Sequence, residues 1–405
     1  MANDNAPSRP SPPPTDISAP EKPAKEAPPV STEELPAGFA SWESLFDEQI
    51  RLNDIADRIV KAGLEGYAGM VVDPTNHDVR LYWKGTLPNK VAAAVEEGRK
   101  LAPVKVLSAP YTDAELRAEA QRWLDSGRAT DAYPKEDGSG VVVGVSTAAS
   151  GGPPVLPGGS RATFTVKYGQ EKFVPAVGEP AGTEKITTPA ASPPWWRWND
   201  TSPYWGGAMY EVVGGPTCTT GFSVIDSEGD PGMLTAAHCG QVNQQVHTLA
   251  DSSYNYGQFY GTWAYQDVAL IWVYKNVSGH VYVGPYYSDW SRAIAGASSN
   301  YTGNYVCPSG AKSGEHCAVK VYYVSPSDVT VRASRVKSGE CAISKGDSGG
   351  PVISQNSGPA WGMGIISAGS GTVTCSENGV KGYHDMVYKG LKFTLGAFGA
   401  TLKTS

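Results

Sequence analysis

The second half of the chain is built from short segments in which apolar and polar residues alternate. Val319–Val324 is one such segment, and similar runs recur between glycine- and serine-rich stretches from about residue 204 onward. Alternation with a period of two indicates half-buried β-strands. Many short strands separated by turn residues are typical of an all-β domain. We therefore predict an all-β domain over residues 204–405.

The first half of the chain shows a different periodicity. Apolar residues from Leu45 to Ile59 recur at near-helical spacing and Gly63 follows them, which predicts one helix. Further strands are predicted at 67–72, 79–83, 104–107, 141–145 and 162–166, and further helices at 88–101 and 112–127. This mixture predicts a small α+β domain over residues 37–170.

Two proline-rich segments flank the predicted α+β domain. Residues 1–36 contain almost no large apolar side chains, so burial cannot offset the entropy of ordering them. We expect a disordered tail there. Residues 171–203 are again rich in proline and are expected to form an exposed linker between the two domains.

The charge balance excludes some classes of partner. Lys and Arg total 33 against 40 for Asp and Glu, which gives a formal net charge of −7. A chain of this charge lacks the electrostatic footprint of a nucleic-acid or anionic-membrane binder. The longest apolar runs, such as Val268–Tyr274, are far shorter than the roughly 18 residues that a membrane-spanning helix needs. We predict neither nucleic acid nor a membrane as a partner.

Cysteine usage indicates an oxidising compartment. The six cysteines all lie in the second half, without a CxxC pair: Cys218, Cys239, Cys307, Cys317, Cys341 and Cys375. Disulfides are the simplest interpretation, and the spacing alone leaves their pairing open. The first 36 residues show neither the basic nor the apolar region of a signal peptide. We expect a secreted protein whose secretion signal is not part of this chain.

The sharpest local motif is Lys345–Pro351, in which Ser348 follows an aspartate and lies among glycines. Glycines permit a tight backbone turn that can aim two N–H groups at one point, where they can stabilise an oxyanion. On its own the segment is also compatible with a surface turn, which is the less favoured interpretation. A second motif favours the catalytic interpretation.

This second motif is Leu234–Cys239, in which His238 follows small residues and precedes a cysteine. On its own His238 is compatible with a buried structural histidine. Downstream, Asp267 stands at the start of an apolar run, where a buried acid needs a partner. If Asp267 orients His238, the histidine can take the proton of Ser348 and the serine can attack a carbonyl. The remaining histidines, His77, His247, His280, His316 and His384, have no metal-ligand spacing and are interpreted as surface or structural residues.

The order His238, Asp267, Ser348 and the motifs TAAHC and GDSGGP resemble the chymotrypsin-like serine peptidases. The spacing of Cys307 and Cys317 is similar to that of the secreted bacterial streptogrisin and α-lytic proteases, and residues 205–210 resemble the start of their mature chain. The resemblance implies two six-stranded antiparallel β-barrels over residues 204–405. It also implies that residues 37–170 are a pro-domain that assists folding and inhibits the enzyme.

The same resemblance implies roles for individual residues. It pairs Cys218 with Cys239, Cys307 with Cys317, and Cys341 with Cys375. The oxyanion donors are the N–H groups of Gly346 and Ser348, and the substrate pocket is formed by Ala342, Ser367, Ala368 and Gly369. Because these pocket residues are small and uncharged, we expect cleavage after large apolar or aromatic residues. Cleavage after basic residues is the alternative, since Glu340 lies next to the position of the acid in trypsin-like enzymes. No metal or other cofactor is expected.

Two departures from the family pattern concern the active site. The segment from Cys341 to Ser348 is one residue longer than in the resembled branch, so the pocket floor cannot be aligned position by position. In addition, Pro308 stands where that branch has an arginine that pairs with the acid before the nucleophile, here Asp347. We hypothesise that Lys312 replaces it, with Lys345 or a freed N-terminus as alternatives.

The sequence thus predicts a secreted serine endopeptidase made as a pro-enzyme. Its expected partners are protein or peptide substrates and its own pro-domain, and it is expected to be a monomer. The alternative is a non-catalytic binding protein on the same fold. If the pro-domain inhibits the enzyme, activity is expected only after the linker is cut near Trp195–Trp205.

Overall fold

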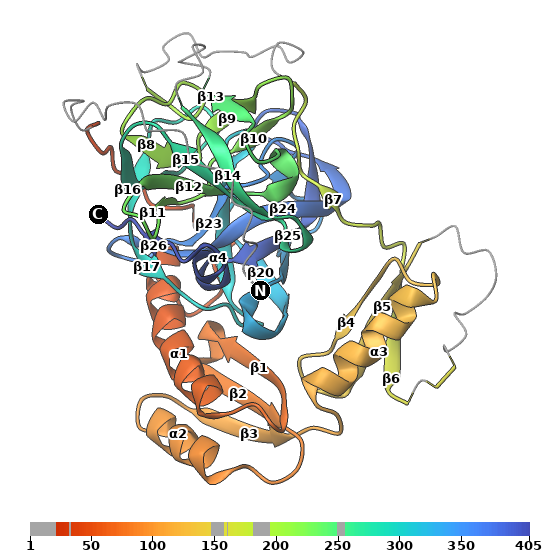
Figure 1. Ribbon diagram of the computed structural model, residues 1–405. Helices are drawn as coiled ribbons and strands as arrows, with labels where there is room; N and C mark the ends of the chain where they lie inside the picture. Colours follow the sequence, from red (N-terminus) through yellow and green to blue (C-terminus); the bar gives the residue numbers. More distant parts are fainter. Residues whose placement is uncertain (1–21, 32–33, 147–157, 160, 181–194, 249–255) are drawn as a thin grey trace.

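A computed structural model of the protein describes residues 22–31, 34–146, 158–159, 161–180, 195–248 and 256–405 (Figure 1). Among these residues no helix combines the length and the apolar character that crossing a membrane requires. Two β-sheets occupy residues 204–405, which we call the β domain. Two smaller α+β lobes precede it.

The first sheet of the β domain is antiparallel, with the strand order β10-β9-β13-β14-β15-β12-β11-β26. Its strands are β9 (Met209–Val212), β10 (Thr217–Thr219), β11 (Ser223–Ile225), β12 (Pro231–Thr235), β13 (Gln245–His247), β14 (Gly257–Trp263), β15 (Val268–Val273) and β26 (Thr401–Leu402). All six residues of β15 are buried, which places this strand in the interior of the sheet.

The second sheet contains a closed barrel. Strands β18, β23, β24, β25, β21 and β20 pair in that order, and β20 returns to β18, all antiparallel. Their bounds are β18 (Tyr305–Gly310), β20 (Val319–Val324), β21 (Val331–Arg335), β23 (Pro351–Ser354), β24 (Ala360–Thr374) and β25 (Lys381–Gly390). The remaining strands of this sheet are β7 (Val174–Pro175), β8 (Tyr204–Gly206), β16 (Val277–Tyr282), β17 (Ser291–Ala297), β19 (Gly314–Glu315) and β22 (Ile343–Ser344). One helix, α4 (Leu391–Phe398), follows β25.

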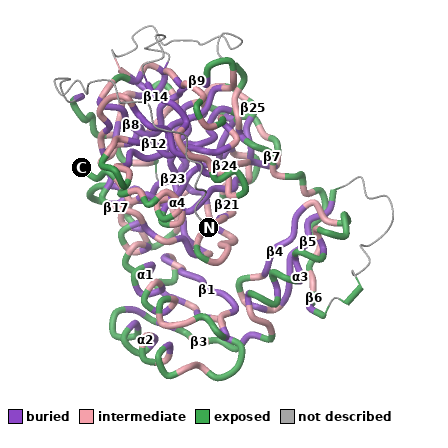
Figure 2. Tube along the Cα trace, in the orientation of Figure 1, coloured by how far each residue is buried: buried purple, intermediate pink, exposed green. Residues whose placement is uncertain are grey.

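The predicted all-β class and the division into two sheets are confirmed. The second sheet closes into a six-stranded barrel, whereas the first is a curled open sheet of eight strands. The C-terminal strand β26 pairs with β11 and thereby extends this first sheet at one edge. Figure 2 shows that buried positions concentrate in the strands of both sheets.

The α+β part consists of two lobes rather than one domain. The first lobe contains α1 (Trp42–Ala62), β1 (Tyr67–Asp73), β2 (Asp78–Trp83), α2 (Asn89–Arg99) and β3 (Val104–Ser108). The second contains α3 (Asp113–Asp125), β4 (Asp131–Pro134), β5 (Gly140–Val145) and β6 (Thr163–Tyr168). Each lobe has a three-stranded sheet and a hydrophobic cluster of its own. The short strand β4 was not expected from the sequence.

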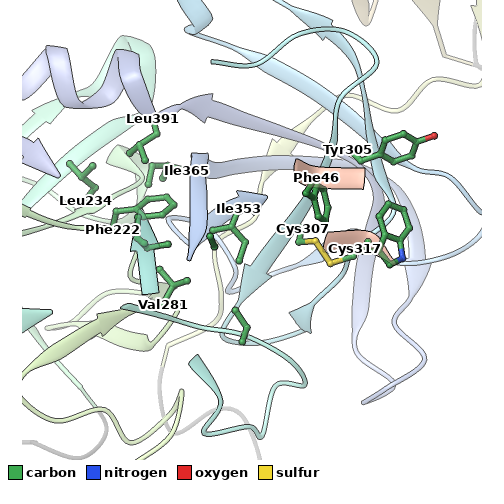
Figure 3. Close-up of a cluster of buried hydrophobic side chains, with 14 of the residues drawn as sticks. Phe46, Phe222, Leu234, Val281, Tyr305, Cys307, Cys317, Ile353, Ile365 and Leu391 are labelled. Atoms are coloured by element: carbon green, nitrogen blue, oxygen red, sulfur yellow. A yellow bond between two sulfur atoms is a disulfide. The ribbon is translucent and has the colours of Figure 1, made fainter. Parts of the chain in front are cut away.

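Helix α1 joins the first lobe to the β domain. Trp42, Leu45 and Phe46 belong to the same buried cluster as Tyr305 and Cys307 (Figure 3). One turn further, the Gln49 side chain donates to the carbonyl of Tyr305 at 3.0 Å and accepts from its N–H at 2.6 Å. The N-terminal face of α1 is therefore part of the core of the β domain.

The predicted disordered tail is ordered in part. Lys22 is buried and forms an ion pair with Asp200, and Glu26 makes a β-bridge with Ser291. The carbonyl of Ser31 accepts a hydrogen bond from the Trp42 indole. Residues 22–31 therefore lie against the β domain, whereas residues 1–21 lie outside the described part of the chain. The pairing of a cation with a buried acid is a tertiary contact that local composition does not reveal.

The predicted exposed linker also differs from the structure. Trp196, Arg197 and Trp198 are buried, and the two indole rings stack with centroids 6.0 Å apart. The Arg197 guanidinium donates to the carbonyls of Gly207, Gly284 and Gly310 and to the hydroxyl of Ser309. These hydrogen bonds of its two terminal nitrogens offset part of the cost of burying the charged arginine.

Candidate active site

The position of His238 is fixed by a short helical turn and a disulfide. His238 is the middle residue of η2 (Ala237–Cys239), which follows strand β12 after one residue, and Cys239 is bonded to Cys218 of strand β10. The other disulfides join Cys307 to Cys317 and Cys341 to Cys375. These are the three pairs that the family resemblance implies.

Asp267 lies beside this histidine. It follows the turn η3 (Ala264–Gln266), adopts a left-handed conformation with φ of 55°, and precedes the buried strand β15. Its carboxylate accepts from Nδ1 of His238 at 2.9 Å and from the backbone N–H of His238 at 3.0 Å. Burial would raise the pKa of Asp267, but hydrogen bonds from His238 and Ser367 outweigh it and lower the pKa below 3.8.

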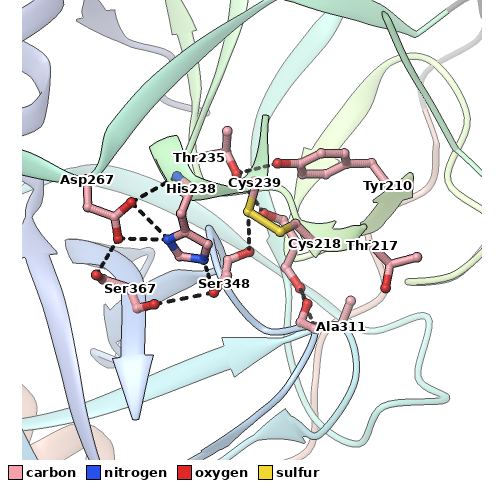
Figure 4. Close-up of a disulfide and its surroundings, with 12 residues drawn as sticks. Tyr210, Thr217, Cys218, Thr235, His238, Cys239, Asp267, Ala311, Ser348 and Ser367 are labelled. Atoms are coloured by element: carbon pink, nitrogen blue, oxygen red, sulfur yellow. Dashed lines mark hydrogen bonds and ion pairs between the residues drawn. A yellow bond between two sulfur atoms is a disulfide. The ribbon is translucent and has the colours of Figure 1, made fainter. Parts of the chain in front are cut away.

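Ser348 completes the arrangement on the other side of the imidazole. Its Oγ lies 2.7 Å from Nε2 of His238 (Figure 4). Ser348 is buried at a tight turn in which Gly349 has a φ of +86°. A Cβ on Gly349 would overlap the Thr235 hydroxyl, so this position requires glycine for both its backbone conformation and its close packing.

Two backbone donors next to Ser348 converge on one oxygen. The N–H of Gly346 lies 2.6 Å and that of Ser348 3.2 Å from the carbonyl oxygen of Ala176. The two residues are those to which the sequence assigns oxyanion binding. A pair of N–H groups aimed at one carbonyl is the geometry needed to stabilise negative charge on that oxygen.

The residues expected to form the pocket lie around Ala176. Ser367, Ala368 and Gly369 are consecutive residues of β24, and Ala368 and Gly369 pair with Pro175 and Val174. The carbonyl of Ser367 accepts from the N–H of Ala176 at 3.2 Å. Ala342 is buried in the same hydrophobic cluster as Ala176. The structure thus places Ser367, Ala368 and Gly369 beside residues 174–176, and Ala342 in the same buried cluster as Ala176.

One contact of the site was not anticipated. The hydroxyl of Ser367 donates a hydrogen bond to the carboxylate of Asp267, in addition to the contact of its carbonyl with Ala176. Ser367 therefore orients the acid as well as lining the pocket. No local sequence pattern signals this, because the two residues are brought together only by the packing of the two sheets.

The structure corrects the proposed partner of Asp347. This carboxylate accepts from the backbone N–H groups of Lys312 at 2.9 Å, Ser313 at 3.1 Å and Ser344 at 2.6 Å, and from the Ser313 hydroxyl. Lys312 thus contributes its backbone, while its ammonium lies over the ring of Trp198, 5.0 Å from the centroid. Burial raises the pKa of Asp347, and these hydrogen bonds oppose the rise.

A buried cation does lie near Asp347, and it comes from the segment predicted as a linker. Arg197 donates to the carbonyl of Gly310 at 3.3 Å, and Gly310 packs directly against the Asp347 carboxyl. Burial lowers the pKa of Arg197, and the charges of Glu315 and Asp347 oppose this effect. The sequence run of three tryptophans around Arg197 was a signal for burial that the prediction of a linker overlooked.

The described residues offer no metal site apart from two groups that contain cysteine. These are Cys218 with His238 and Cys239, and Cys307 with Glu315 and Cys317. In both groups the two sulfur atoms are bonded to each other, so neither is available as a thiolate ligand.

No family model and no curated protein matches the chain. Several solved structures do match part of the chain. A protease from Nocardiopsis is 26% identical and protease A from Thermobifida fusca is 24% identical, each with a TM-score of 0.38. A chymotrypsin from Cellulomonas bogoriensis is 24% identical, with a TM-score of 0.37. The similarity covers 49%, 50% and 50% of this chain, respectively, and 98% of each of those chains.

Proposed function

We propose that the protein is a serine endopeptidase that hydrolyses peptide bonds through an acyl-enzyme on Ser348. The observation that carries this proposal is the continuous set of hydrogen bonds from Asp267 through His238 to Ser348, next to two N–H groups that share one carbonyl oxygen. A nucleophile, a base, a residue that orients the base and an oxyanion site are the parts that acyl transfer requires.

In the proposed reaction Ser348 Oγ attacks the substrate carbonyl and His238 Nε2 accepts the serine proton. Asp267 holds Nδ1 of His238, which fixes the tautomer and stabilises the imidazolium. The N–H groups of Gly346 and Ser348 bind the oxyanion. His238 then protonates the leaving amine, and water attacks the acyl-enzyme with His238 again acting as base.

We further propose that the chain is a secreted pro-enzyme in which the two α+β lobes act as the pro-domain. The three disulfides support an extracellular location, since such bonds persist in oxidising compartments. The packing of α1 into the core of the β domain supports a role for the first lobe in folding. Protein or peptide substrates follow from the proposed reaction.

The alternative, a non-catalytic binding protein on this fold, predicts no turnover. The test is hydrolysis of denatured casein by the purified protein and by its Ser348→Ala variant. We expect release of peptides by the wild type and none by the variant, with equal circular dichroism spectra. Equal rates for both proteins would refute the proposed nucleophile. Absence of hydrolysis by either, including after the segment between the lobes and the β domain has been cut with an added protease that is then removed, would favour the binding protein.

A further inference from the structure

The site around Ser348 is occupied by a segment of the chain itself. Residues 174–179 run through it, between the second lobe and the β domain. On one side of the site, β7 pairs antiparallel with β24, Val174 opposite Gly369 and Pro175 opposite Ala368. The N–H of Ala176 continues this ladder to the carbonyl of Ser367. The segment thus adds a strand to β24 beyond the stretch that pairs with β23, as an extended peptide ligand does.

On the other side the same segment pairs with the first sheet. The N–H of Gly178 donates to the carbonyl of Thr217 at 3.0 Å. The carbonyl of Glu179 accepts from the backbone N–H of Thr217 at 3.3 Å and from its hydroxyl at 2.9 Å. The extended segment is therefore held on both sides of one peptide bond, the bond between Ala176 and Val177.

The carbonyl of that bond is bound in the expected oxyanion site. Its oxygen accepts from Gly346 and Ser348, and the Ser348 hydroxyl is hydrogen-bonded to His238. We propose that Ala176–Val177 is the bond that the enzyme cuts in its own chain, and that its pocket selects a small apolar residue. This inference rests on the proposed function and specifies the substrate of the same site.

The step forms and breaks bonds as in any acyl transfer. Ser348 Oγ bonds to the carbonyl carbon of Ala176, and the C–N bond to Val177 breaks as His238 gives its proton to the departing nitrogen. Water then hydrolyses the ester. The products are a carboxylate at Ala176 and a new amino terminus at Val177.

The size of the pocket follows from the burial of Ala176. None of the surface of this residue is accessible, so no space as large as a water molecule borders its methyl group. Its neighbours in the cluster include Ala342 and Ile343, which are also fully buried. A large side chain in place of the methyl would have to displace these residues, which costs typically about 1–3 kcal/mol in a packed core. We therefore expect the pocket to accept a small residue before the cleaved bond, in place of the large apolar or aromatic residue expected from the sequence.

The segment near Trp195–Trp205, where the sequence led us to expect the processing cut, fits the site less well. Trp196, Arg197, Trp198 and Trp205 are buried, and Arg197 is held by several carbonyl groups. A peptide bond in that region would have to leave the core before it could enter the cleft. The Ala176–Val177 bond needs no such rearrangement.

The test is the fate of the purified full-length chain. We expect wild-type protein to convert to two fragments, the larger beginning Val-Gly-Glu-Pro by N-terminal sequencing, with a first-order rate that does not depend on protein concentration. Ser348→Ala should stay intact. Ala176→Phe should slow the cut at least tenfold, while Ala118→Phe, a matched change at an exposed alanine of α3, should not.

A second measurement does not depend on how the variants fold. Wild-type enzyme is given the free peptide Phe-Val-Pro-Ala-Val-Gly-Glu, the sequence of residues 173–179, and the same peptide with phenylalanine in place of alanine. We expect cleavage after alanine, with kcat/KM at least tenfold above that of the second peptide. An active enzyme that starts at another residue or prefers phenylalanine overturns this inference but leaves the proposed function standing. Absence of any Ser348-dependent cleavage overturns both.

Discussion

The hydroxyl of Ser367 donates a hydrogen bond to the carboxylate of Asp267. The carbonyl of the same serine accepts from the N–H of Ala176. One residue of β24 thus touches both the acid that orients His238 and the segment in the cleft. Substrate alignment and the orientation of the base therefore depend on the same short stretch of strand.

Replacing Ser367 by alanine should lower kcat about tenfold, since a hydrogen bond to a charged group is typically worth about 1.5–3 kcal/mol. KM should change little, because the backbone carbonyl that binds substrate remains. The hydrogen bond from Ser367 contributes to lowering the pKa of Asp267, so its loss should move the acid limb of the kcat profile to higher pH. Ser367→Thr, which keeps a hydroxyl, is the control, and an unchanged pH profile in Ser367→Ala would count against the positioning role.

The Asp267→Asn variant should lose about ten-thousand-fold in kcat, the loss typical of a triad whose histidine is held in the wrong tautomer. It should also change the dependence of stability on pH. The folded-state pKa of Asp267 lies below 3.8, so its charge stabilises the fold above that pH and the contribution is lost as pH falls through the folded value.

The free energy of unfolding of Asp267→Asn should consequently lack this decline on acidification. Urea denaturation from pH 2 to pH 6 measures this pH dependence of the free energy of unfolding. It is carried out in the Ser348→Ala background to prevent self-cleavage. Parallel pH curves for the two proteins would show that Asp267 is not held in its charged form.

Removing the charge of Arg197 and removing that of Lys312 should have different effects on the free energy of unfolding. Arg197→Met should destabilise the β domain by about 3–5 kcal/mol, because it leaves buried carbonyls and the Asp347 charge without their cation. Lys312→Met should cost less than about 1 kcal/mol, since the backbone N–H of Lys312 holds Asp347 and its ammonium lies over the ring of Trp198.

Thermal unfolding of both variants in the Ser348→Ala background, with the exposed-site change Arg58→Met as control, separates these expectations. A larger loss in Lys312→Met than in Arg197→Met would restore lysine as the partner of Asp347.

His316 should make the protein less stable in acid. Burial, together with the nearby Arg335, lowers the pKa of His316 to about 3, and among the described atoms its Nε2 is buried without a hydrogen-bond partner. The unfolded chain binds a proton at this residue below about pH 6.5, whereas the folded chain does not until about pH 3. Stability is therefore lost as pH falls through this window, by up to about 1.4 kcal/mol per pH unit.

The His316→Gln variant should show a shallower loss of unfolding free energy between pH 6 and pH 4 than the parent protein. Chemical denaturation of both at several pH values gives the two slopes. Equal slopes would mean that His316 is protonated in the folded state.

Local sequence patterns predicted some features of this protein, whereas other features depend on contacts between distant segments. Helical spacing and alternation located helices α1, α2 and α3 and five of the six strands β1–β6, because burial of one face produces a periodic pattern within a short segment. The motifs around His238 and Ser348 identified the residues that the structure brings to 2.7 Å. The division of the first part into two lobes was not foreseen, since it depends on which helix covers which sheet.

Contacts between segments that are far apart in the sequence could not be predicted from local patterns. Nothing in residues 174–179 distinguishes a segment that fills the site from a spacer, because the hydrogen bonds that hold it there are made by its backbone groups. The hydroxyl of Ser367 reaches Asp267 only through the packing of the two sheets. Arg197, in contrast, was flanked by tryptophans whose apolar surface favours burial, and that signal outweighs the neighbouring prolines.

The most direct test of the account is whether Ser348 is an activated nucleophile. The purified protein, after conversion to fragments, is treated with a fluorophosphonate probe, digested, and examined by mass spectrometry. The account predicts one adduct, on Ser348, which is lost in Asp267→Asn and His238→Ala at short reaction times. An unlabelled Ser348 in correctly folded, processed protein would contradict it.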